Sequence, residues 1–204
     1  MKRKIFFLSL IFTLLTFLTS CASKDGKNEL CDFLLTDGYS ASFDFCITEN
    51  GSEKLSGSAI VSKEDTISIS FSSPEVLNGL SVSSDAEALA DTLIFSYYGM
   101  KAPLPSGALS DINAMLSFFS DECAVSISSL PRKAVKTPET EMLPDKSSGI
   151  IKELSFTDEN GVETCVIYDA ATGLPIRFSD KKTDGEITIT FTKIKRPTLK
   201  DGTK

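Results

Sequence analysis

The segment Tyr39 to Thr48, YSASFDFCIT, predicts the fold class. Its odd positions are apolar and its even positions are mostly small or polar, which is a period of two residues. Successive side chains of a β-strand point to opposite faces, so this period predicts a strand with one buried face. Glu49-Asn50-Gly51 follows, and Asn-Gly readily takes the positive φ angles of a hairpin turn. We therefore expect a β-rich, antiparallel domain.

The same alternation recurs later in the chain, in both its first half and its last third. Pro74 ends a third strand, and a meander of four strands with glycine-containing turns fills the last third. Two helices are expected, at 28–36 and near 106–120, whereas Leu130 to Ser148 is expected to be a loop. The expected strands are Tyr39–Thr48, Leu55–Val61, Ile67–Phe71, Leu80–Ser83, Leu93–Tyr98, Ala124–Ser128, Ile150–Phe156, Val162–Tyr168, Leu174–Phe178 and Ile187–Thr192.

These elements predict one α+β domain over 28–196, with about nine or ten strands, followed by a disordered tail at 197–204. Nine strands at about 4.8 Å spacing make a sheet about 43 Å wide, which two helices about 10 Å across cannot cover if it stays flat. The sheet is therefore expected to curl into an unclosed half-barrel with the helices on its concave face. A two-sheet sandwich also fits the pattern.

The N-terminus has the pattern of an export signal. A basic cluster, Lys2 to Lys4, precedes an apolar run from Ile5 to Phe17, which is shorter than the roughly 20 residues of a membrane span. Leu18-Thr19-Ser20-Cys21 resembles the lipobox of bacterial lipoproteins, which implies lipidation of Cys21. We therefore expect a signal peptide at 1–20, a tether at 21–27 and a lipid anchor that holds the domain on the extracytoplasmic face of the cell membrane.

Composition excludes several functions. The chain has 21 basic and 28 acidic residues, so it lacks the basic surface that binding to nucleic acid needs. It has no histidine, which excludes Ser-His-Asp and Cys-His catalysis and His-ligated metal sites. The Ser179–Lys182 S-x-x-K and the acidic pairs Glu64-Asp65, Asp121-Glu122 and Asp158-Glu159 fall at expected turns or helix ends, where solvated side chains are the simplest interpretation. We expect neither an enzyme nor a cofactor or metal site.

Four cysteines remain beside Cys21, and an oxidising compartment permits disulfides. Their spacing matches no zinc motif, and the sequence leaves open whether they form one or two disulfides or stay buried as thiols. They are Cys31, Cys46, Cys123 and Cys165.

The order of elements resembles the LolA/LolB-type lipoprotein carriers. The resemblance rests on the lipobox, the first helix and strand, Ser73-Pro74 at the end of the third strand, the mid-chain helix and the Asp169 to Pro175 hairpin. It implies an unclosed β-barrel with a helical lid over an apolar cavity, and a ligand with acyl chains. We therefore expect a membrane-anchored protein that binds an apolar ligand or acyl chain. The alternative is an envelope interaction or sensory module that has a filled core and a protein partner. The candidate ligand-binding residues are Phe43, Phe45, Ile67, Ile69, Phe71 and Phe191.

The lipobox gives the first prediction. Replacing Cys21 with alanine removes the thiol that would carry the lipid, so Cys21→Ala is expected to block both lipidation and normal cleavage. Mass spectrometry of the purified N-terminus measures this. An unmodified Cys21 on an uncleaved wild-type chain would contradict the prediction.

Overall fold

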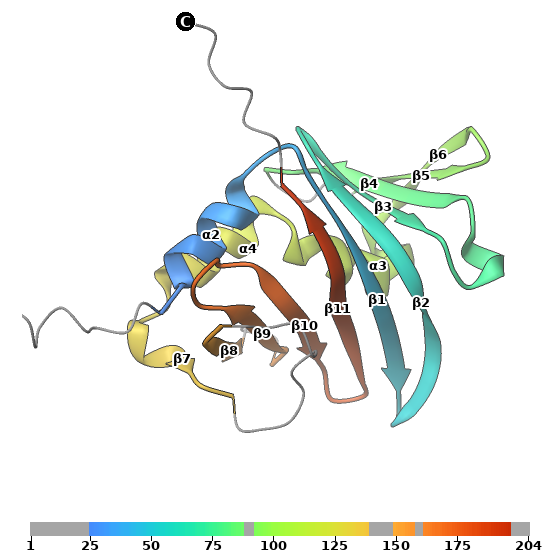
Figure 1. The fold of residues 1–204 in the computed structure, drawn as a ribbon. Coiled ribbons are helices and arrows are strands. Elements are labelled where there is room, and N and C mark those ends of the chain that lie inside the picture. Colours follow the sequence, from blue (N-terminus) through green and yellow to red (C-terminus); the bar gives the residue numbers. More distant parts are fainter. Residues whose placement is uncertain (1–24, 88–91, 139–148, 158–160, 197–204) are drawn as a thin grey trace, which may run out of the picture.

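The computed structural model describes residues 25–87, 92–138, 149–157 and 161–196. The predicted signal peptide, the lipobox with Cys21 and the predicted C-terminal tail lie outside these ranges. In the described part, eleven strands form one antiparallel sheet with the order β6-β5-β4-β3-β2-β1-β11-β10-β9-β8-β7. The sheet curves around helices on its concave side (Figure 1). This confirms the unclosed, β-rich α+β fold, and a two-sheet sandwich is not formed.

The first half of the chain builds one wing of the sheet as a meander. The hairpin between its first two strands turns at Asn50 and Gly51, whose φ angles are 52° and 76°, as the Asn-Gly pair predicts. The strands of this wing are β1 (Tyr39–Glu49), β2 (Ser52–Lys63), β3 (Thr66–Phe71), β4 (Leu80–Asp85), β5 (Thr92–Tyr97) and β6 (Met100–Pro105), with a short 3-10 helix η1 (Glu75–Leu77) between β3 and β4.

The second half of the chain builds the other wing. Its last strand pairs with β1, which places the first and last long strands side by side in the middle of the sheet. The strands are β7 (Val135–Lys136), β8 (Ile151–Thr157), β9 (Glu163–Asp169), β10 (Pro175–Lys181) and β11 (Gly185–Lys195). The short β7 lies within the segment that we expected to be a loop.

Among the described residues, three α-helices cover the concave side: α2 (Lys27–Leu35), α3 (Ser110–Phe118) and α4 (Asp121–Ser129), with 3-10 turns η2 (Ser106–Leu109) and η3 (Arg132–Ala134) at their flanks. The expected strand at Ala124–Ser128 is wrong, because this segment belongs to α4. Ser120 caps that helix by accepting a hydrogen bond from the Cys123 backbone N–H, and Asp121 and Glu122 occupy its first turn. These N-terminal signals outweigh the strand propensity of Val125 and Ile127.

The core lies between the helices and the apolar face of the sheet. From Tyr39 to Thr48 of β1 the odd positions are buried and the even positions are more exposed, so the alternation in the sequence places its apolar side chains inward. α3 packs against β3, β4 and β11, and α2 packs along α4. Phe118 ends α3 and Phe119 follows it. Both are fully buried and reach across to Phe178 and Phe191.

Burial of β1 gives the second prediction. Phe43 is fully buried, so Phe43→Asp is expected to lower the free energy of unfolding by about 3–5 kcal/mol, because it removes an aromatic side chain and places a carboxylate in the core. Ser42→Asp, at the neighbouring position on the opposite face, is the control and should change stability far less. Urea denaturation measures both variants, and equal losses would contradict the assignment of the two faces.

Candidate functional site: the concave face of the sheet

The six predicted ligand-binding residues share the concave face of the sheet. Five of them, from β1 and β3, are at most 3% exposed, and Phe191 of β11 is half-buried. The rings of Phe45 and Phe71 meet edge to face at 5.5 Å, and the ring of Phe119 lies 6.0 Å from those of Phe43 and Phe191. These six side chains therefore belong to a core that α3 fills with its own aromatic residues.

The same face continues beyond the helices at the outer edge of the first wing. The register pairs Leu93 with Leu104, Phe95 with Ala102 and Tyr97 with Met100. Leu93 is fully buried, so the residues that share its face point to the concave side. Toward the hairpin tip, however, burial falls, and Met100 is 69% exposed. We define the concave edge patch as Leu77, Phe95, Tyr97, Met100 and Leu104.

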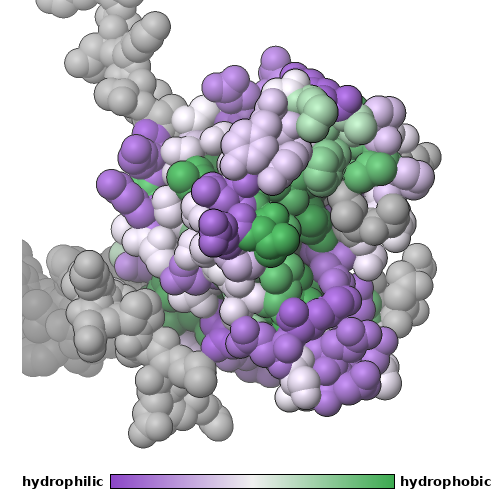
Figure 2. Space-filling view, turned by 90° about the vertical axis from the view of Figure 1, so that its right-hand side faces the viewer, coloured by the Kyte–Doolittle hydropathy of each residue, from purple (hydrophilic) through white to green (hydrophobic). Residues whose placement is uncertain are grey.

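The surface at this end of the molecule is visibly apolar. Figure 2 shows the face on the right-hand side of Figure 1, toward which the β5–β6 hairpin projects, and a hollow there exposes hydrophobic surface within a border of hydrophilic side chains. Leu77, Phe95 and Tyr97 are partly buried and pack against the main core. The concave edge patch is thus a partly exposed extension of the core.

Two further hollows flank the helices. One, of about 440 Å³, lies between the α3–α4 region and strands β9 and β10, with Phe118, Phe156 and Phe178 among serine, threonine and charged side chains. The other, of about 370 Å³, lies beside α2 and is lined by Phe33, Tyr39 and Arg196, among others. The Arg196 guanidinium lies 5.9 Å from the centre of the Phe33 ring. None of the six predicted residues lines either hollow.

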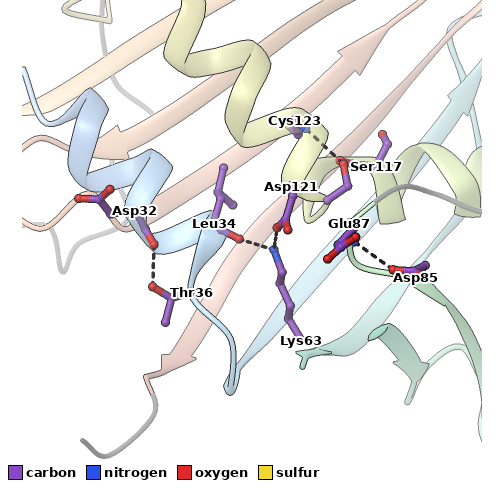
Figure 3. Close-up of polar contacts among 10 residues, drawn as sticks. Asp32, Leu34, Thr36, Lys63, Asp85, Glu87, Ser117, Asp121 and Cys123 are labelled. Atoms are coloured by element: carbon purple, nitrogen blue, oxygen red, sulfur yellow. Dashed lines mark hydrogen bonds and ion pairs between the residues drawn. The ribbon is translucent and has the colours of Figure 1, made fainter. Parts of the chain in front are cut away.

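A buried lysine fixes the helices over the core. Lys63, at the end of β2, is fully buried, and its Nζ donates to the Leu34 carbonyl oxygen at 2.5 Å. The same Nζ pairs with Oδ1 of Asp121, also at 2.5 Å, so one ammonium group joins the end of α2, the start of α4 and the sheet (Figure 3). Sequence reasoning missed this group, because Asp121 was interpreted as a solvated helix end.

The other end of α2 is held by a second lysine and by close backbone packing. The Lys27 Nζ donates to the carbonyl oxygens of Ser128 and Leu130, at 3.0 and 2.6 Å, at the end of α4. Gly173, in the β9–β10 turn, has φ 69°, and a Cβ added there would lie 2.3 Å from the Glu29 carbonyl carbon. The turn can therefore approach α2 only with glycine at this position.

Burial raises the pKa values of two ionisable groups near α2 and α4. It raises the pKa of the Tyr39 phenol well above its ordinary value, with the nearby Cys123 and Asp121 adding to the effect. Burial also raises the pKa of the Cys123 thiol to about 12. Both groups stay neutral at physiological pH, so neither provides a nucleophile or a base. Among the described residues, no group of three or more acidic or cysteine side chains could hold a metal ion.

Within the described ranges, no helix has both the length and the apolar character that crossing a membrane requires.

Comparisons with known proteins bear on the fold. No protein-family model matches the sequence, and no curated protein is significantly similar to it. An uncharacterised conserved protein from Thermus thermophilus superposes with a TM-score of 0.50 and 14% identity over 85% of this chain and 86% of its own. This likeness supports the fold alone.

Two other solved structures are also similar. The lipoprotein LppX of Mycobacterium tuberculosis has a TM-score of 0.47 and 12% identity over 89% of this chain and 100% of its own. A LolA-superfamily protein from Nitrosomonas europaea has a TM-score of 0.38 and 10% identity over 89% of this chain and 96% of its own.

The Lys63 contacts give the third prediction. Asp121→Ala leaves the Lys63 ammonium buried without its counter-ion, and it is expected to lower the free energy of unfolding by about 3 kcal/mol. Lys63→Met removes the charge and keeps the apolar stem, so the expected loss is smaller. Urea denaturation compares the two variants. A larger loss for Lys63→Met than for Asp121→Ala would contradict this account of the ion pair.

Proposed function

We propose that this protein is a lipid-anchored, extracytoplasmic protein that binds an acyl chain or another neutral apolar ligand at the concave edge patch. The observation that supports this most strongly is the apolar face of β5 and β6, which continues the core but lies partly exposed, with Met100 69% exposed. Contiguous apolar patches of more than a few hundred Å² are rare on monomeric soluble proteins and often mark binding sites. The ligand is proposed for this patch rather than for the six core residues, which α3 already covers.

Apolar burial would supply the affinity. Each 100 Å² of apolar surface removed from water contributes about 2.5 kcal/mol before the costs of ordering the ligand. An acyl chain suits the patch because its methylene groups need no charged partner. The chain carries a net charge of −7, so repulsion would disfavour free fatty acids and favour neutral or esterified chains.

The proposed anchor would reach the domain close to α2. Three residues separate Cys21 from Asp25, a span of at most about 14 Å. The Asp25 carbonyl oxygen accepts a hydrogen bond of 2.9 Å from the Tyr168 hydroxyl, which fixes this point of the chain on β9. In Figure 1, α2 begins on the left and the β5–β6 hairpin projects on the right. A ligand at the concave edge patch would therefore lie at the far side of the domain from the anchor.

A protein partner at the same patch is the second candidate function, and the filled core beneath α3 favours it. The free edge of this wing is β6, where Pro103 and Pro105 provide no backbone N–H for a further strand. A partner would therefore bind through side chains of the concave edge patch, not by extending the sheet.

The fourth prediction separates these two functions. The chain without residues 1–21 is purified, examined for bound lipid by native mass spectrometry, and titrated with an environment-sensitive apolar dye. Met100→Glu is expected to weaken dye binding about tenfold or more, because it places a charge in the patch.

Ile94→Glu is the matched control. Ile94 is 41% exposed on the same hairpin, but its position alternates with those of Leu93 and Phe95 and so lies on the convex face. It should bind the dye like the wild type. If no lipid is found and the dye does not bind, the ligand-binding function fails and the protein-partner function replaces it. If both variants lose affinity equally, the concave edge patch is not the site.

A further inference from the structure

We propose that Cys31 and Cys123 form a disulfide under oxidising conditions, and that this bond ties α2 to α4. The thiols are unbonded in the structure. That the protein meets an oxidising compartment rests on the proposed extracytoplasmic location. The choice of pair rests on the fold alone.

The sheet separates the four cysteines into two groups. Cys46 alternates with the buried Phe45 and Ile47, and Cys165 precedes the buried Val166, so both thiols lie on the convex face. Cys31 and Cys123 belong to helices on the concave side. Four cysteines can form two disulfides in three ways, and two of these ways join a helix cysteine to a convex-face cysteine. Such a bond would have to pass through the sheet, so both are excluded.

The two convex cysteines are too far apart to bond with each other. The register places Cys46 opposite Thr188, Thr188 opposite Ser179 and Ser179 opposite Cys165. Three strand spacings separate them, about 14 Å, whereas the Cα atoms of a disulfide lie within about 7 Å. Cys46 and Cys165 therefore stay reduced.

The polar contacts at both ends of α2 define how it lies against α4. At one end, Lys27 donates to the carbonyl groups of Ser128 and Leu130. At the other end, the Leu34 carbonyl and Asp121 share the Lys63 ammonium. The helices are thus antiparallel, with residue 27 level with about 129 and residue 34 level with 121. Interpolation between these two levels places Cys31 opposite Ala124, the residue next to Cys123.

The electrostatic environment agrees with this placement. Burial raises the pKa of the Cys123 thiol to about 12, and the second-largest cause is the nearby thiol of Cys31. Burial also raises the pKa of Cys31, which is 6% exposed. Because the thiolate is the attacking species, two thiols with raised pKa values react slowly once the helices have packed. The bond is therefore expected to close during folding.

The reaction is an ordinary thiol–disulfide exchange. The two thiols lose two protons and two electrons, the Sγ–Sγ bond forms, and the disulfide of the oxidant is reduced to two thiols. The oxidant is a protein or small-molecule disulfide. The product fixes α2, which follows the proposed anchor, to the helix that covers the core.

Peptide mapping tests the pairing. The full-length chain is expressed with its export signal, purified without reductant, denatured, alkylated with iodoacetamide and digested. Mass spectrometry is expected to find one linked peptide pair that contains Cys31 and Cys123, with Cys46 and Cys165 alkylated. Any linkage other than Cys31–Cys123 would overturn the proposal. So would alkylation of all four cysteines, if Cys31 and Cys123 also stay free when the purified chain is refolded with an oxidant.

A refolding experiment makes the test independent of location. The chain from residue 22 is reduced, unfolded and refolded in a mixture of oxidised and reduced glutathione. A Cys31–Cys123 link here supports the pairing even if the exported chain is unlinked, in which case it is the extracytoplasmic location that fails. Free Cys31 and Cys123 in the refolded chain overturn the pairing itself.

Thermal unfolding gives a second measurement. The melting temperature of the oxidised protein is expected to fall by about 5–10 °C on addition of dithiothreitol, because the bond closes a long loop. Cys31→Ser should remove this difference, and Cys46→Ser should keep it. A reductant effect that persists in Cys31→Ser would overturn the proposal.

Discussion

The apolar face of the single sheet must be covered, and this need determines the curvature of the sheet and the place of the helices. Eleven strands in a single layer present far more apolar surface than three short helices can cover if the sheet is flat. Curvature brings β3, β4 and β11 to the same helix, so α3 contacts strands from both wings. The helices are held in turn by polar contacts at their ends, where Lys63 and Lys27 donate to backbone carbonyl groups.

The strands with clean alternation could be predicted from the sequence, because each has one buried and one solvated face. β6 was missed because Pro103, Pro105 and Lys101 conceal the weaker alternation of Met100, Ala102 and Leu104. α4 was interpreted as a strand because Val125 and Ile127 are β-branched, although the Ser120 cap and the two following acids are helix-start signals. Local propensity and capping competed there, and packing against α2 favoured the helix.

The candidate site could be predicted only as a face of the sheet. The sequence places Phe43, Phe45, Ile67, Ile69, Phe71 and Phe191 on the concave side, but which part of that side stays open depends on where α3 lies, and this is a tertiary property. Lys63 shows the same limit. Lys63 lies on the same buried face of β2 as Ala59 and Val61. In the sequence, however, it directly precedes Glu64-Asp65, so it resembles a solvated turn residue. Its burial depends on Asp121, which is remote in sequence.

The attachment of the first described residues has a mechanical consequence. A pull on the N-terminus meets the Tyr168–Asp25 hydrogen bond first, and then the two contacts of Lys27 with the end of α4. Because α2 and α4 are antiparallel, force directed along α2 shears their interface instead of opening it from one end. β1, the central strand, begins twelve residues beyond Lys27, so it lies behind α2 in the path of the force. Helix α2 would thus take up force from the proposed membrane tether before the sheet does.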